Sequence, residues 1–433
     1  IGPQIGLAWS PGRFHDKLVV RGGYGLNYNQ EEIAISANIA GNPGLVVFPS
    51  LTMATPSSAN PGIIYAVSSG THNLTGYPAN PNTVVVFGSN GLPASGTGFN
   101  VSIFPKDLPT MRVHHYSLDT EYDLGHDFVA SLGYQGSLSR NTYFHENPLA
   151  VPATLGYPFN PQIGGGDYWG VSGSGNYNAL LAELKHRFSR QFMADAQFAW
   201  AKSMDTSSAP YSEQVFPFNP SLNYGRSDYN VDKAFKLYGM WQPIFFHGSN
   251  SWMEKVAGGW SLSGILNLHS GFPWTPEVSV QGGSLYCGQC GYSQLFPAAY
   301  LGGAGTSTSN DAFKTGSNYP KGGLAYFSLP TYTAFMNTDS GTALPQTGIR
   351  RNSFTGPGYR DVDMTLAKAF GLPKMPVLGE SAKLEFRMDV YNLFNNLNFN
   401  PTSISNNIAN ANFGQATSAL AARVITLGAR FSF

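Results

Sequence analysis

The stretch "VITLGARFSF", residues 424–433, decides the fold class of this chain. Its positions alternate between apolar and polar, and the apolar set comprises Ile425, Leu427, Phe431 and Phe433. A period of two is the pattern of a β-strand with one apolar and one polar face. An aromatic residue at position 433 is unusual, because soluble chains usually end in frayed polar residues. The pattern therefore raises the question of what the apolar face of such a strand contacts.

The same alternation recurs along the chain. In "KLEFRMDVY", residues 383–391, one parity is uncharged and the other carries Lys383, Glu385, Arg387 and Asp389. About eleven strands are predicted in this way. Besides these two stretches, the predicted strands lie near residues 4–9, 17–28, 115–122, 127–138, 179–188, 191–200, 233–245, 259–272 and 359–370.

Composition excludes several classes of protein. The 433 residues carry 25 Lys and Arg against 25 Asp and Glu, so there is no net charge to favour nucleic acid. Charged residues make up 12% of the chain, about half the usual share, and aromatics make up 14%. No apolar run reaches the ~18 residues of a transmembrane helix, but a membrane-spanning β-strand needs only about 9–11 residues.

The predicted connections alternate strictly between two classes. Long loops are rare in compact soluble domains, whereas short turns on one rim and long loops on the other are typical of outer-membrane barrels. The short turns are predicted at 10–16, 124–127, 189–191, 247–259 and 371–381. The long loops are predicted at 29–109, 139–176, 205–232, 273–358 and 395–421. This pattern predicts an all-β, antiparallel transmembrane barrel portion.

On the apolar face, the residue types change with position along the strands. This arrangement favours a face that contacts lipid over one that packs on a second sheet. A Lys or Arg that faces lipid costs about 2–4 kcal/mol at the midplane and about 0–1 kcal/mol near the interface. The basic exceptions lie near strand ends: His114, Lys202, Lys233 and Arg423 at the outer ends, and His186 and Lys368 near the turns. Aromatics on this parity cluster beside the short turns: Tyr122, Phe128, Phe188, Phe192, Phe245, Trp260, Phe370 and Phe433. A soluble sandwich or propeller, the alternative, has no reason to show such bands.

Several stretches, in order, resemble the C-terminal barrel of TonB-dependent receptors, particularly the Oar-like group with a carboxypeptidase-regulatory-like domain. They are "IGLAWSPGRFHDKLVVRGGYGLNYNQ", "NYGRSDYNVDKAFKLYGMWQPIFF", "VAGGWSLSGILNLHSGFPWTP", "RNSFTGPGYRDVDMTLAKAF" and "LEFRMDVYNLFNNLNF". The resemblance implies a barrel of 22 strands around an N-terminal plug. Residues 1–433 then correspond to the C-terminal part, without the plug and the N-terminal strands. Such a piece is not expected to close as a pore by itself.

The resemblance also implies a function and a location. We expect a receptor or transporter in the cell outer membrane that takes up an unidentified substrate, such as a saccharide, peptide or chelate. The expected partners are the lipid bilayer, TonB through the missing N-terminal part, and the barrel-assembly machinery, which reads a terminal signal at Phe431 and Phe433. The alternative is a non-transporting surface protein or adhesin with long extracellular loops. No cofactor, nucleic-acid partner or enzyme motif is expected.

The polar parity supplies the candidate site residues, which are expected to face the barrel lumen. Two interpretations stay open: a ladder of compensating charges that solvates the lumen and holds the plug, or a direct substrate path. The candidates are Glu183, Lys185, Arg187, Asp195, Asp361, Asp363, Lys383, Glu385, Arg387 and Asp389.

The only cysteines, Cys287 and Cys290, form one C-G-Q-C stretch in the longest predicted loop. A local disulfide is the main hypothesis in an oxidising compartment. A redox pair or half of a zinc site is the alternative, but no second C-x-x-C or nearby His pair completes a metal site.

Overall fold

The architecture comes from a computed structural model. The parts of the chain that it describes are residues 2–29, 99–146, 163–189, 191–209, 223–244, 257–280, 294–297, 299–300, 327–328, 351–372, 382–407 and 414–432, with isolated residues at 42, 89, 410 and 412.

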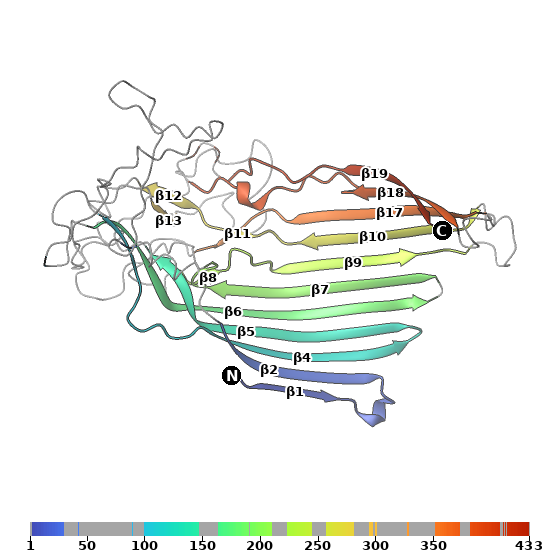
Figure 1. Ribbon diagram of the computed structural model, residues 1–433, viewed down its shortest axis with the longest axis horizontal. Helices are drawn as coiled ribbons and strands as arrows, with labels where there is room; N and C mark the ends of the chain where they lie inside the picture. The colour runs from blue at the N-terminus through green and yellow to red at the C-terminus, as the bar shows by residue number, and fades with distance from the viewer. Residues whose placement is uncertain are drawn as a thin grey trace, which may run out of the picture.

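A single, mainly antiparallel sheet dominates the fold (Figure 1). It contains thirteen strands, of which β3 and β8 lie off the main path, so eleven strands follow one another in the order of the chain. That number and order confirm the prediction. The path runs through β1 (Gln4–Trp9), β2 (Leu18–Tyr28), β4 (Arg112–Gly125), β5 (Phe128–Glu146), β6 (Ile163–Ser189), β7 (Phe192–Asp205), β9 (Lys233–Trp241), β10 (Trp260–His269), β17 (Tyr359–Gly371), β18 (Lys383–Tyr391) and β19 (Val424–Ser432).

The two ends of the strands form different rims. At the short-turn rim, neighbouring strands join closely, as in the two-residue turn between β4 and β5. Its residues His126 and Asp127 have φ of 54° and 68°, the left-handed values that a tight type I′ hairpin turn requires. At the opposite, long-loop rim lie β11 (Pro273–Trp274), β12 (Glu277–Val280) and β13 (Gln294–Pro297) (Figure 1). β11 pairs with β16 (Phe354–Thr355) and β12 with β13, and a further short pair joins β14 (Ala299–Tyr300) to β15 (Phe327–Ser328).

The remaining elements are brief. β8 (Gly225–Arg226) pairs with the end of β7, and β3 (Phe99–Ile103) runs parallel to the start of β6. The described residues include the 3₁₀ turns η1 (Gly12–Phe14) between β1 and β2 and η7 (Pro401–Ser403) after β18. Among the described residues, no helix has the length and apolarity to cross a membrane.

The register sorts side chains into two faces of the sheet. Leu184, Ala196 and Leu237 lie directly opposite one another on β6, β7 and β9 and define the apolar face. The adjacent pair, Glu183 on β6 and Gln197 on β7, points to the opposite, polar face of the sheet. Because a one-residue slip would exchange the two faces, the regular register from Gly175 to His186 on β6 fixes which side chains share a surface.

The loop predicted at 139–176 was too long. β5 continues to Glu146 and β6 begins at Ile163, so β6 has 27 residues, well beyond the roughly 9–11 that cross a bilayer. The Gly-rich start of β6 has no apolar alternation and therefore gave no strand signal. Its packing explains the glycines, because a Cβ on Gly170 would collide with the buried ring of Phe144.

Aromatic rings cover the two basic exceptions near the short turns. The Lys368 Nζ lies 5.6 Å from the centre of the Trp260 ring and 4.8 Å from that of Phe370. The His186 ring lies 4.5 Å from Phe128 and 5.1 Å from Phe192, between centroids. A cation over an aromatic face is stabilised by the ring quadrupole, so Lys368 is tolerated on the apolar face. His186 is accommodated there by ring contacts with Phe128 and Phe192.

Candidate functional site

A charged row crosses the polar face where β6, β7 and β9 meet. The register places Lys185, Asp195 and Tyr238 directly opposite one another. The Tyr238 hydroxyl donates to Asp195 Oδ2 at 2.6 Å, and Lys185 Nζ lies 3.8 Å from the same oxygen. Asp195 is 1% exposed, whereas the Lys185 side chain is 47% exposed. The row therefore holds a buried carboxylate whose main partner is a neutral hydroxyl.

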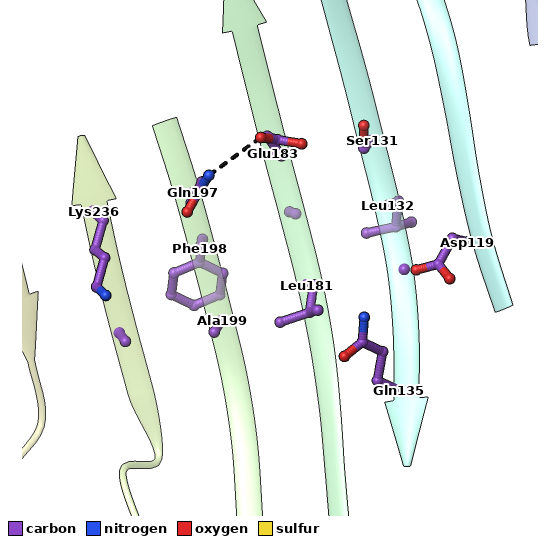
Figure 2. Close-up of a pocket in the computed structure, with 13 residues that line it drawn as sticks. Asp119, Ser131, Leu132, Gln135, Leu181, Glu183, Gln197, Phe198, Ala199 and Lys236 are labelled. Atoms are coloured by element: carbon purple, nitrogen blue, oxygen red, sulfur yellow. Dashed lines mark hydrogen bonds between the residues drawn. The ribbon is translucent and has the colours of Figure 1, made fainter. Parts of the chain in front are cut away.

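The next row of the polar face borders a hollow of about 480 Å³. Gln197 Nε2 donates to Glu183 Oε1 at 3.2 Å, and Lys236 follows on β9 (Figure 2). Asp119 and Ser131 approach from β4 and β5, so five neighbouring strands contribute polar side chains to one concavity. Carboxylates, amides, a hydroxyl and an ammonium group can together hydrogen-bond a polar solute.

A second charged group lies on β17 and β18. Arg387 Nε donates to both oxygens of Asp389, at 2.7 and 2.9 Å, and Thr365 Oγ1 donates to Asp389 Oδ1 at 2.6 Å. Asp361 accepts from the Tyr359 hydroxyl at 2.9 Å. Asp363 accepts from the backbone N–H of Asn392 at 2.9 Å, which ties β17 to the chain after β18.

The structure therefore divides the predicted residues between two groups rather than one site. β9 and β10 separate Glu183, Lys185 and Asp195 from the residues of β17 and β18. Arg187 and Lys383 are exposed, and Glu385 lies opposite Arg430 in the register. In the described part of the chain, none of these last three candidates forms a side-chain ion pair.

Sequence reasoning missed a third polar region, the arginine cluster at the long-loop rim, defined by Asp205, Arg226, Asp228, Arg351 and Asn352. Arg351 donates to the carboxylate of Asp205, to Asp228 Oδ1 at 2.9 Å and to the backbone oxygen of Asp205 at 2.9 Å. Its Nε donates to the backbone oxygen of Asn223 at 2.9 Å. The side chains of Arg351 and Asp205 are 14% and 9% exposed.

Arg226 completes this cluster from the opposite direction. Its guanidinium donates to the backbone oxygens of Asn352 and Phe354, each at 2.7 Å, and to Thr355 Oγ1 at 2.8 Å. Burial lowers the pKa of Arg226, and the negative charge of Asp232 partly offsets this effect. Asn352, with φ of 57°, returns a hydrogen bond to the backbone oxygen of Arg226 at 2.7 Å.

The cluster joins two segments that the sequence separates widely, since Asn352 comes 126 positions after Arg226. Both segments belong to stretches that resemble the receptor family, "NYGRSD" and "RNSFTG", but both fall in predicted loops. The backbones of the two segments approach closely at Gly225. This approach requires glycine, because a Cβ at this position would collide with the Arg351 carbonyl. Only the Arg and Asn residues that the two loop ends share offered a signal.

The described residues contain no group of three or more His, Cys, Asp or Glu side chains that could hold a metal ion. Cys287, Cys290 and Phe433 lie outside the described residues. Phe431 lies on β19, directly opposite Leu384 of β18 on the apolar face.

Comparisons with known proteins agree with this architecture. The family described as outer membrane beta barrel domain matches residues 1–426. No curated protein matches the sequence.

Several solved structures are similar at low identity. The outer membrane transporter YddB from Escherichia coli is 10% identical with a TM-score of 0.47, over 98% of this chain and 39% of that one. The FrpB iron transporter from Neisseria meningitidis is 9% identical with a TM-score of 0.42, over 99% and 38%. BauA, the ferric preacinetobactin receptor from Acinetobacter baumannii, is 11% identical with a TM-score of 0.42, over 100% and 36%. This chain thus spans less than two fifths of the length of those chains.

Proposed function

The chain belongs to the outer membrane β-barrel domain family, and from that premise we propose that it forms part of the wall of a TonB-dependent receptor that imports a small polar substrate. Hydrocarbon offers no partner for backbone N–H and C=O groups, so a sheet that crosses it must pair its strands in a barrel. The apolar face of the sheet then contacts lipid in the outer membrane, and the polar face borders the interior.

The single observation that carries the proposal is the hollow on the polar face. Its lining alternates acceptors and donors from adjacent strands, with Glu183 and Asp119 as acids and Lys236 as the cation. A wall that served only to hold surface loops would not need a polar concavity of about 480 Å³ at this level. The mixed charge favours a polyhydroxylated, peptide or chelate substrate over a purely apolar one.

The resemblance to TonB-dependent receptors supports the energy source of the proposed import. It covers most strand pairs, from "IGLAWSPGRF" to "LEFRMDVYNLF", in one order. We place the plug and the contact with TonB, which the resemblance implies, outside this chain. The proposed chemistry is binding and passage, and no bond is made or broken.

The test is uptake in cells that produce the natural protein from which this chain comes. Radiolabelled oligosaccharides, peptides and iron chelates are supplied in turn, with and without a protonophore that collapses the inner-membrane gradient. We expect one class to accumulate only when the protein is present and the gradient is intact. Uptake that is equal with and without the protonophore would indicate a passive pore. No uptake of any class, together with lost attachment of cells to surfaces, would favour an adhesin.

A further inference from the structure

The apolar face carries cations at its outer end and no carboxylates below them. The cation belt is defined as the basic residues of this face nearest the long-loop rim: Arg112, Arg140, Lys202, Lys233, Arg360 and Arg423. In the described part of the sheet, the apolar-face positions from these residues to the short turns include no Asp or Glu. The belt is therefore a one-sign surface.

The belt cations differ from those of the polar face in their pairing. On the polar face, Arg21 meets Glu121 at 3.1 Å and Arg387 meets Asp389 at 2.7 Å. All the belt residues are exposed, and within the described ranges none of them forms an ion pair. Arg140 and Arg423 donate only to backbone oxygens, those of Ser139 at 3.0 Å and Leu393 at 3.3 Å. Their charges are available to a partner outside the chain.

The belt follows a constant depth in the membrane. Along the hydrogen-bonded rows, Arg140 is level with Arg112 of β4, Lys202 with Tyr116, and Lys233 with Leu118. Arg360 is level with Thr120. From one strand to the next, the belt cation therefore moves toward the short-turn rim by on the order of one residue on average, measured along the strand. Strands tilted by about 35–45° and spaced about 4.8 Å apart require a step of about 1–1.5 residues to stay at one height.

The distance to the opposite interface agrees with this depth. On β4, β7 and β17, about ten residues separate each belt cation from the aromatic residue at the short-turn rim. At a rise of about 3.3 Å and a tilt of about 40°, ten residues span about 25 Å along the membrane normal. That is the height of the apolar band of an outer-membrane barrel. The pairs are Arg112 with Tyr122, Lys202 with Phe192, and Arg360 with Phe370.

Interfacial side chains lie at or just below the belt on the same face. The Tyr24 hydroxyl bonds His114 Nδ1 at 2.8 Å, and the hydroxyls of Tyr116 and Tyr134 donate to Asn178 Oδ1 at 3.1 and 2.7 Å. Tyrosine has an apolar ring and a hydroxyl that can be hydrated, and it is enriched at the head-group level of membranes. The belt therefore lies where lipid head groups begin, outside the hydrocarbon.

We propose that the cation belt binds the phosphate groups of lipopolysaccharide, the anionic lipid of the outer leaflet. Guanidinium and ammonium groups pair strongly with phosphate, and the missing carboxylates remove any competing partner within the face. A row at one depth across β4, β5, β7, β9 and β17 fits a layer of head groups better than a single soluble anion. This inference needs only the barrel, so it stands whether or not the proposed import is correct.

The test uses the natural protein, purified from outer membranes in detergent and exchanged into nanodiscs of zwitterionic phosphatidylcholine. Fluorescent lipid A is titrated in and its affinity is measured. We expect the double variant Arg112→Gln/Lys202→Gln to bind about 25-fold more weakly, at roughly fivefold per cation, with the loss shrinking at high salt. The matched control, Arg21→Gln/Arg430→Gln, removes two cations of the polar face and should bind as the wild type does.

Further arms separate the alternatives. The charge-keeping variant Arg112→Lys/Lys202→Arg should retain the affinity within a few fold, which excludes a folding defect as the cause of the loss. Heat-modifiable migration on gels checks the folding of each variant. Equal weakening in the control, or unchanged affinity in the belt variant, would overturn the proposal. Displacement of lipid A by inorganic phosphate at the same phosphate concentration would also overturn it, because the site would then bind a soluble anion.

Discussion

The polar face holds two regions that use the same side-chain types in opposite ways. Midway along the wall, Lys185, Asp195 and Tyr238 come from adjacent strands and sit beside an open hollow. At the long-loop rim, Arg226 and Arg351 come from segments far apart in the chain and are enclosed by acceptors. The wall row combines a buried Asp195 with an exposed Lys185 and few hydrogen bonds, whereas the arginine cluster is closed and densely bonded.

The two regions differ in how much of their hydrogen-bonding capacity the protein itself uses. In the cluster, the guanidinium groups of Arg351 and Arg226 donate to several protein oxygens, so little capacity remains for a ligand. In the wall row, the side chain of Lys185 is half exposed, and the neighbouring row of Glu183, Gln197 and Lys236 lines the hollow. We therefore assign the cluster to anchoring the long loops and the wall row to contact with a solute.

The largest expected effect is that of Arg351→Ala. It leaves the carboxylate of Asp205, 9% exposed, without its cation, and breaking a buried ion pair costs about 3–5 kcal/mol. Urea unfolding in detergent micelles, followed by tryptophan fluorescence, measures the loss. The control is Arg21→Ala, which breaks a pair whose side chains are 59% and 36% exposed and should cost about 0–1 kcal/mol. Equal losses in the two variants would mean that the cluster is not closed.

The strands and their faces could be predicted because the information is local. Each strand of the main path shows its own alternation, and the short turns fix which strand comes next, so even Gln4–Trp9 was placed correctly. The start of β6 was missed because glycine and serine have no apolar face to alternate. There the strand is specified by packing on Phe144 and Trp169, which are 2% exposed, and not by periodicity.

The candidate site could be predicted only in part, for the same reason. Alternation assigns Glu183 and Asp195 to the polar face but does not say which neighbours lie opposite them. That depends on the register between strands, which brought Gln197 and Tyr238 into contact with them. The arginine cluster depends on contacts over 126 residues and more, for which a single sequence carries no spacing rule.

A smaller effect is expected for Asp195→Ala in the wall row. The change removes the acceptor of the Tyr238 hydroxyl. Because Tyr238 is part exposed, water can replace that acceptor, and we expect the loss of about one net hydrogen bond, roughly 0.5–1.5 kcal/mol. The same urea titration measures it. Asp195→Asn keeps an acceptor oxygen in place and should recover most of the loss. If Asp195→Ala cost as much as Arg351→Ala, the wall row would be as closed as the cluster, and the contrast between them would fail.

The smallest effect is expected for Lys185→Ala, and it decides how open the wall row is. Lys185 Nζ lies 3.8 Å from Asp195 Oδ2, beyond hydrogen-bonding distance, and its side chain is 47% exposed. Solvent therefore screens the attraction, and we expect a cost of about 0–1 kcal/mol. A double-mutant cycle with Asp195→Ala, read by urea unfolding, isolates the coupling of the two residues and should give no more than about 1 kcal/mol. A coupling of about 3 kcal/mol would show that Lys185 is committed to Asp195 and is not free to meet a solute. A small coupling leaves its ammonium as a group that can contact a substrate without loss of stability.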